Sequence, residues 1–135
     1  MASNTHFAWG AVNAEADALA AYLSNGWLRI YDGTQPTDAD ARITTQSLLA
    51  ELRFGSPAFA KADHGELKAN RIGPCRQAAA TGTATWFRCS KSDGATAVVD
   101  GSVGTFGCDL NLDNVAIQTG GEIRLSSFKL KLNRQ

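Results

Sequence analysis

The sequence has no excess of charge of either sign. Lys and Arg together number 13, Asp and Glu also number 13, and the formal net charge is zero. A general nucleic-acid binder carries a basic excess that neutralises phosphates. The balance therefore predicts that DNA and RNA are not direct partners. It also gives little colloidal protection against self-association, which suits a protein that ends up in an assembly.

Cysteine is scarce, and its spacing excludes two kinds of small stabilised domain. Cys75, Cys89 and Cys108 are odd in number, widely separated and without a CxxC pair. Such spacing does not predict a disulfide framework or a zinc site. We expect three reduced thiols that pack as small apolar groups, and we expect no metal or other cofactor.

Long apolar runs are also missing. No stretch approaches the roughly 18 consecutive apolar residues that a membrane helix needs, so no membrane partner is predicted. The first ten residues lack a basic region followed by an apolar stretch, which does not predict a secretory signal. The 135 residues, of which 44% are hydrophobic, fit one globular domain with a single core.

The N-terminal segment divides into an arm and a helix. Residues 1–12 show no clear period and are expected to form an extended arm, with residues 13–135 as a single domain. Phe7 and Trp9 in the arm are costly to leave in water, so both are candidate interface residues. Asn13 is a plausible N-cap for a helix over residues 14–24. Its apolar face follows the i, i+3, i+4, i+7 spacing at Ala16, Leu19, Ala20 and Leu23.

After Gly26 the hydrophobic period changes to two, which is typical of strands. Short strands are expected around residues 27–31, 48–54, 59, 67, 83–90, 96–100, 108–112 and 115–117. His64-Gly65 is expected to form a turn, and residues 101–107 a flexible glycine-rich connection. Many short strands with one N-terminal helix predict a mainly β fold. We expect a jelly-roll-like antiparallel β-sandwich.

The last predicted strand, residues 122–132, contains a change of phase. Ile123 and Leu125 have one parity, whereas Phe128, Leu130 and Leu132 have the other. A one-residue bulge at Ser126-Ser127 would return all five side chains to one face. Arg124 and Lys129 would then point outward, and they are a second pair of candidate interface residues.

No pattern in the chain predicts catalysis. Asp109, Asn111 and Asp113 resemble the opening of a calcium loop, but they alternate with apolar residues as a solvated strand face does. Asp63-His64 is an acid–imidazole pair without a nucleophile motif, in an expected turn. The glycine-rich residues 101–107 lack the lysine of a phosphate loop. We therefore expect a protein that is not an enzyme.

Several short segments of the sequence form a distinctive set. They are Leu28-Arg29-Ile30-Tyr31-Asp32-Gly33-Thr34-Gln35-Pro36 with Asp38-Ala39-Asp40, then Thr81-Gly82-Thr83-Ala84-Thr85-Trp86-Phe87-Arg88, Ser92-Asp93-Gly94, Asp100-Gly101-Ser102-Val103-Gly104-Thr105 and Asp109-Leu110-Asn111-Leu112. As a set they resemble a family of small virion-associated structural proteins of tailed phages and prophages, over roughly residues 12–132. The residues at Cys75, Arg76, Cys89 and Lys91 depart from that pattern. The resemblance implies a virion location, assembly in the host cytoplasm and no chemical motif.

The size and the expected jelly-roll fold suggest a more specific role by analogy with cement proteins of short-tailed phages. In that role the chain would be a capsid decoration protein, a dimer or trimer bound to the major capsid protein. Two alternatives stay open. One is a tail, baseplate or fibre-anchoring virion protein; the other is a carbohydrate-binding domain that uses Trp27 and Trp86 as stacking platforms.

Overall fold

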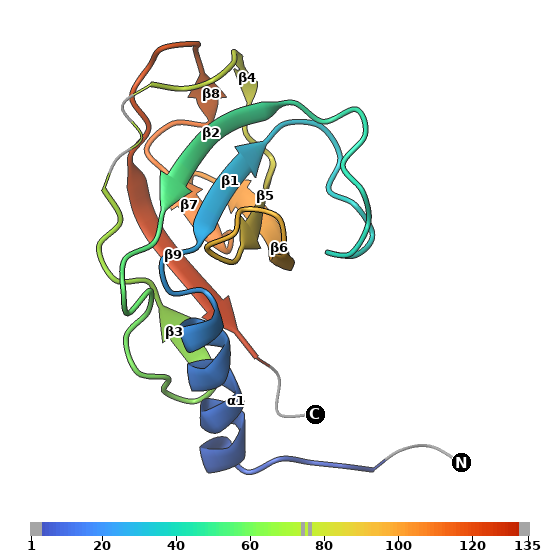
Figure 1. The fold of residues 1–135 in the computed structure, drawn as a ribbon, viewed down its shortest axis with the longest axis vertical. Coiled ribbons are helices and arrows are strands. Elements are labelled where there is room, and N and C mark those ends of the chain that lie inside the picture. Colours follow the sequence, from blue (N-terminus) through green and yellow to red (C-terminus); the bar gives the residue numbers. More distant parts are fainter. Residues whose placement is uncertain (1–3, 74, 76, 133–135) are drawn as a thin grey trace.

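The computed structural model describes residues 4–73, 75 and 77–132. One N-terminal helix, α1 (Trp9–Tyr22), leads into a mainly β body (Figure 1). The strands are β1 (Trp27–Tyr31), β2 (Leu48–Arg53), β3 (Glu66–Lys68), β4 (Gly82–Thr83), β5 (Trp86–Ser90), β6 (Ala97–Gly104), β7 (Leu110–Leu112), β8 (Ala116–Ile117) and β9 (Leu125–Lys131). The predicted mainly β fold with one N-terminal helix is confirmed.

Seven of these strands form one open, mixed sheet in the order β2-β1-β5-β6-β7-β9-β3, and β4 pairs with β8 in a small second sheet. The expectation of a purely antiparallel arrangement is wrong at one place, because β6 and β7 run parallel. Ala78 and Ala79 connect β2 with the segment between β8 and β9: the Ala79 amide donates to the Leu49 carbonyl, and the Ala78 amide to the Gly121 carbonyl. Cys75 and Ile123 also form an isolated antiparallel bridge, with one hydrogen bond in each direction.

The helix begins four residues before the predicted N-cap. Its first residue is Trp9, and Ala8 occupies the N-cap position without a side-chain hydrogen bond. The Oδ1 atom of Asn13 instead accepts a hydrogen bond from the Gly65 amide at 2.8 Å. Asp17 similarly accepts from the Ala62 amide at 2.8 Å. Burial of Val12 on the same face gives the additional turn its stabilisation, and residues 9–12 are therefore helical rather than part of an extended arm.

The bulge predicted in the last strand is confirmed. Leu112 is opposite Leu125 and Asn111 is opposite Ser127, so Ser126 is the additional residue on β9. Phe128 and Leu130 consequently face the core together with Ile123. The β-bulge thus restores one apolar face, where a strict period of two would expose half of these side chains.

The predicted His64-Gly65 turn is also confirmed, since both residues have positive φ (50° and 74°).

Two strand predictions are wrong. The expected strand at residues 83–90 is interrupted between β4 and β5, where the Ala84 amide bonds to Val115 and the Thr85 amide to Tyr31. Residues 101–104, expected to be flexible, continue β6 beside β5. A Cβ atom at Gly101 would lie 2.4 Å from the Phe87 ring, so glycine here permits close packing rather than flexibility.

The core centres on four phenylalanines from distant parts of the chain. The Phe128 ring lies 5.1 Å from Phe87, 5.7 Å from Phe59 and 6.0 Å from Phe54, between ring centroids. All four side chains are at most 5% exposed. One face of the β1-β2-β5 region covers this cluster, which leaves the opposite face of the same strands for polar groups.

Candidate functional site

The two candidate anchors near the N-terminus lie on different structures. Phe7 is 41% exposed on the extended residues 4–8, which run away from the body of the molecule (Figure 1). Trp9 is half-buried in the first turn of α1, and its ring meets the His64 ring edge-to-face at 5.1 Å. Trp9 therefore helps to fix the arm to the body, and Phe7 is the more exposed of these two candidate anchors.

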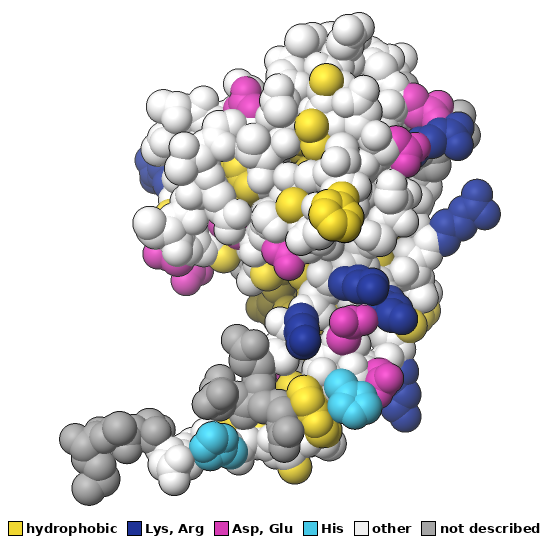
Figure 2. Space-filling model, turned by 180° about the vertical axis from the view of Figure 1, so that it is seen from behind, with side chains coloured by type: hydrophobic (Ala, Val, Ile, Leu, Met, Phe, Trp, Pro, Cys, Tyr) yellow, Lys and Arg dark blue, Asp and Glu magenta, His cyan; other side chains and the backbone are white. Residues whose placement is uncertain are grey.

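The second pair of candidates is exposed, as predicted. Arg124 precedes β9 and forms an ion pair with Glu122. Lys129 lies on β9, with its ammonium group 4.0 Å from a Glu66 carboxylate oxygen. Both basic groups are partly neutralised by these neighbours. Figure 2 shows the same intermixing of basic and acidic side chains over the lower part of one face.

The structure does not gather the four predicted residues into one patch. Trp9 contacts the His64-Gly65 turn that leads into β3, and Lys68 of β3 is opposite Lys129. Trp9 and Lys129 are thus at the same end of the molecule. Arg124 is five residues earlier along the chain, on the order of 15 Å away at the usual rise of a strand. It is a separate surface.

Sequence reasoning missed Phe106, which is 89% exposed. It stands between Thr105 and Gly107 in the connection from β6 to β7, which was interpreted only as a flexible turn. An aromatic residue inside a glycine-rich turn has little room to pack inward, and that signal was available in the sequence. Singly exposed apolar side chains are common, but an almost fully exposed phenylalanine at a loop tip fits an interaction anchor.

The outer face of the sheet carries a row of four charged side chains across four strands. Glu51 on β2 is opposite Arg29 on β1, Arg29 is opposite Arg88 on β5, and Arg88 is opposite Asp100 on β6. Arg29 Nε lies 2.8 Å from Glu51, and Arg88 Nε lies 2.6 Å from Asp100. The two arginines are therefore neighbours in the middle, with one carboxylate at each end.

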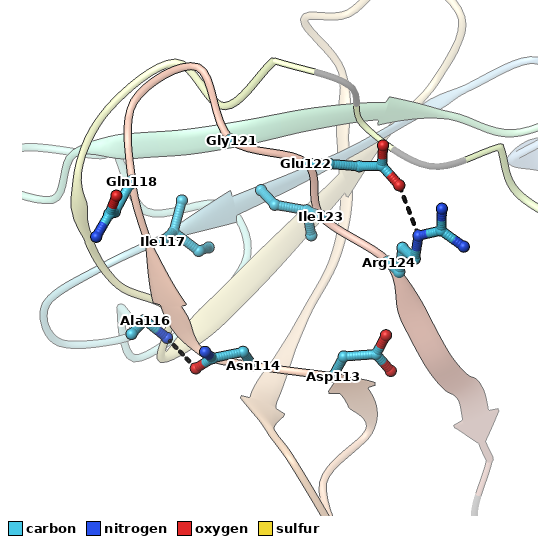
Figure 3. Close-up of a pocket in the computed structure, with 9 residues that line it drawn as sticks. All are labelled: Asp113, Asn114, Ala116, Ile117, Gln118, Gly121, Glu122, Ile123 and Arg124. Atoms are coloured by element: carbon cyan, nitrogen blue, oxygen red, sulfur yellow. Dashed lines mark hydrogen bonds and ion pairs between the residues drawn. The ribbon is translucent and has the colours of Figure 1, made fainter.

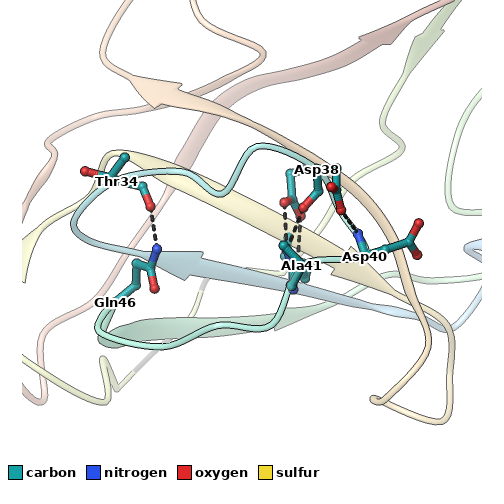
Figure 4. A network of polar contacts seen from close by, with 7 residues as sticks. Thr34, Asp38, Asp40, Ala41 and Gln46 are labelled. Atoms are coloured by element: carbon teal, nitrogen blue, oxygen red, sulfur yellow. Dashed lines mark hydrogen bonds and ion pairs between the residues drawn. The ribbon is translucent and has the colours of Figure 1, made fainter.

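The Arg88–Asp100 end of this row is buried and holds a long loop. Arg88 donates to both carboxylate oxygens of Asp100, and its Nη1 donates to the Ala41 carbonyl at 2.8 Å. The hydrogen bond to Asp100 raises the pKa of the Arg88 guanidinium above its usual value. The connection between β1 and β2 also has internal hydrogen bonds (Figure 4). The Asp40 backbone amide donates to the Asp38 carboxylate, and the Gln46 side-chain amide donates to the Thr34 carbonyl. Arg88 thus fixes this loop over the sheet.

Two aromatic rings lie beside the charged row. Tyr31 stacks on Trp86 with 4.6 Å between ring centroids, and the Trp86 Nε1 donates to the Asp32 carbonyl. Trp86 is fully buried, so it cannot serve as the stacking platform that a carbohydrate-binding domain needs. Burial also raises the pKa of the Tyr31 hydroxyl. Trp27 is half-buried with the Arg53 guanidinium 4.4 Å from its ring centroid.

An open pocket of about 390 Å³ surrounds Arg124 (Figure 3). Residues 113, 114, 116–118 and 121–124 line it, including Asp113, Glu122 and the buried Ile117 and Ile123. The Asn114 side chain accepts a hydrogen bond from the Ala116 amide and so serves the local turn. None of the described residues that line it is aromatic.

The weaker chemical motifs of the sequence serve local structure. Asp109 accepts from Ser102 and Asp113 accepts from Ser126, so their oxygens do not converge. His64 Nδ1 lies 2.8 Å from Asp63 in an exposed turn. Within residues 4–73, 75 and 77–132, no three His, Cys, Asp or Glu side chains are grouped as metal ligands. In the same part of the chain, no helix has the length and apolar character to cross a bilayer.

Comparisons with protein-family models, with curated proteins and with solved structures found no match to this chain. The interpretation of the site therefore depends on its own geometry.

Proposed function

We propose that this chain is a virion structural protein of a tailed phage, and specifically a capsid decoration protein that binds the assembled lattice of the major capsid protein. It would act by surface contact, with no bond made or broken, on the outside of the head, as a dimer or trimer. The resemblance of residues 28–40, 81–88, 92–94, 100–105 and 109–112 to virion proteins of tailed phages supports the virion assignment. We extend the proposal to a jelly-roll-like sandwich, in which Ala78 and Ala79 connect β2 with the segment between β8 and β9.

The observation that carries this proposal is the position of Phe7. It stands on an extended segment that leaves the body and is joined directly to α1, whose Val12 is fully buried. A phenylalanine on a segment whose far end is anchored by a buried helix residue would lose less conformational freedom on docking than one on a chain end without such an anchor. Complete burial of such a side chain contributes about 1.5–3 kcal/mol. Phe106 would provide a second, independent contact of the same kind.

Binding to an assembled lattice would stabilise the shell by mass action. A protein that binds the assembled state and not the free subunits adds its binding free energy to the shell. Attachment through two anchors, or as a dimer or trimer, raises the effective affinity without stronger individual contacts. Zero net charge is compatible with this, because binding would not depend on a strong electrostatic field.

The test compares phage heads assembled with and without this protein. Heads that lack it should lose DNA at a lower temperature, and purified protein should restore the difference. Phe7→Ser and Phe106→Ser should restore it poorly. Tyr22→Ser is the matched control, because Tyr22 is also an exposed aromatic side chain (49%) but lies on α1.

Two results would contradict the proposal. Heads without the protein that withstand heat as well as complete heads would exclude a cementing role. A copy number of three, six or twelve per particle would place the chain in the tail or baseplate instead, since a shell protein is present in many more copies.

A further inference from the structure

Two arginines face each other on the outer surface of the sheet. Arg29 and Arg88 are direct partners in the register of β1 and β5. Like charges directly opposite one another on neighbouring strands destabilise a sheet. Glu51 and Asp100 pair with the two arginines from the outer sides. The order across the four strands is negative, positive, positive, negative, so the positive potential is strongest between the arginines.

A pocket of about 130 Å³ lies at this position. Its lining includes Arg29, Arg88, Tyr31 and Ser90, with the turn at Gly94 and Ala95 as part of its wall. It is distinct from the pocket around Arg124, because the two share no residue. Both arginines are held in place, Arg29 by Glu51 and the Gly94 carbonyl, and Arg88 by Asp100 and the loop carbonyls.

One buried hydrogen-bond donor at the pocket, the Ser90 hydroxyl, has no acceptor among the described residues. Ser90 is 4% exposed, and its buried Oγ has no partner within the part of the chain that the structure describes. Buried hydroxyl groups without a partner are rare in folded proteins because their desolvation is costly. Arg29 uses Nε for Glu51 and Nη1 for Gly94, and Nη2 makes no hydrogen bond to a described residue. Tyr31, whose ring is largely buried, also lines the pocket, and no hydrogen bond joins its Oη to a described residue, although Ser90 Oγ is the one buried side-chain atom among them that lacks a partner.

We propose that this pocket is a binding site for a carboxylate group. A carboxylate accepts hydrogen bonds only, and Ser90, Tyr31 and Arg29, which line the pocket, all carry donors. A carboxylate between Arg29 and Arg88 would make the charges across the four strands alternate, because a negative group would then separate the two arginines. A water molecule would satisfy the hydroxyls but would not offset the repulsion between the arginines. The four charged side chains of the row sum to zero, so a carboxylate adds a single negative charge to the site, whereas a phosphate dianion would add two.

The carboxylate has two possible sources with the same chemistry, a free small acid or an acidic side chain of a partner protein. The site does not depend on the decoration proposal, because free acetate can test it without any phage component. The full-length protein, labelled with ¹⁵N, is titrated with sodium acetate and with sodium chloride at equal ionic strength. Acetate should produce saturable shifts of the Ser90, Gly94 and Ala95 amides, and chloride should not.

Variants of the pocket hydroxyls sharpen this test. A hydrogen bond to a charged group contributes roughly 1.5–3 kcal/mol. Ser90→Ala and Tyr31→Phe should therefore each weaken acetate binding by tenfold or more, since 1.4 kcal/mol corresponds to tenfold. Arg53→Lys is the matched control: Arg53 packs on Trp27 on the same face, outside the pocket, and acetate binding should not change. Amide spectra of each variant without acetate establish that it is folded.

A further titration identifies the source. A short peptide with a single glutamate side chain and blocked ends should bind more tightly than acetate if a partner supplies the carboxylate, and no more tightly if the ligand is a free acid. The absence of a saturable acetate shift in the wild-type protein would overturn the site. Equal shifts with chloride would overturn its assignment to carboxylates.

Discussion

Asp100 forms a bidentate ion pair with Arg88 that is almost completely buried. Arg88 Nε lies 2.6 Å from Oδ1 and Nη2 lies 2.8 Å from Oδ2, with the two side chains 10% and 5% exposed. Arg88 also donates to carbonyl groups of the loop between β1 and β2. A single buried pair thus connects the centre of the sheet to the longest loop and to the proposed carboxylate site.

Removal of one member of this pair should be strongly destabilising. Asp100→Ala leaves a buried guanidinium without its carboxylate, which typically costs 3–5 kcal/mol. We expect a loss of about that size in the free energy of unfolding measured in urea. Glu122→Ala removes the exposed partner of Arg124 and serves as the control, with an expected effect below about 0.5 kcal/mol. Equal effects of the two substitutions would contradict the assigned role of Asp100.

Truncation of Phe128 should lower the stability of the protein far more than truncation of Phe106. Phe128 contacts three other buried phenylalanines, so Phe128→Ala should cost about 3–5 kcal/mol of stability. Phe106 is 89% exposed, so Phe106→Ala should change stability by less than about 0.5 kcal/mol. Thermal or urea unfolding measures both. A large loss for Phe106→Ala would show that its ring packs on the body of the protein.

The three cysteines should differ in reactivity. Cys89 is fully buried, and burial, with Asp100 as a smaller contribution, raises the pKa of its thiol well above the usual value. The thiolate is the reactive species, so Cys89 should resist thiol reagents in the folded protein and react only after unfolding. Cys75 and Cys108 are half-buried and should react in the folded state. Mass spectrometry of labelled peptides assigns each site, and labelling of native Cys89 would refute the prediction.

Acid should loosen the turn at residues 92–96. Hydrogen bonds from the Thr96 hydroxyl and from the Thr96 and Ala95 amides lower the pKa of Asp93 from 3.8 to about 2. Because the folded-state pKa is depressed, the stabilisation is complete above about pH 4 and is lost as the pH falls through 2. Amide exchange at Ala95 and Thr96 should accelerate over that interval. Asp93→Asn should abolish this dependence, and a carboxyl titration near pH 4 would disagree with it.

Local patterns in the sequence determined much of the β body. Alternation predicted β1 and β2, the position of His64-Gly65 between two short apolar segments predicted a turn, and the phase change predicted the bulge at Ser126-Ser127. These features depend on neighbours in the chain, because a pleated strand with one buried face dictates which side chains can be apolar. The exposure of Arg124 and Lys129 followed from the same reasoning.

Contacts between distant segments decided the rest. Asn13 resembles an N-cap, but the Gly65 amide uses its side chain, so the helix begins at Trp9. Trp86 and Phe106 are both aromatic residues that follow a threonine, yet one is fully buried and the other is 89% exposed. Which strands are neighbours, and hence which charges face each other, also depends on the whole sheet. The opposition of Arg29 and Arg88 across β1 and β5 could not be predicted from residues 59 positions apart in the chain, because hydrogen-bonded pairing of strands is specified by the packed core beneath them rather than by either strand alone.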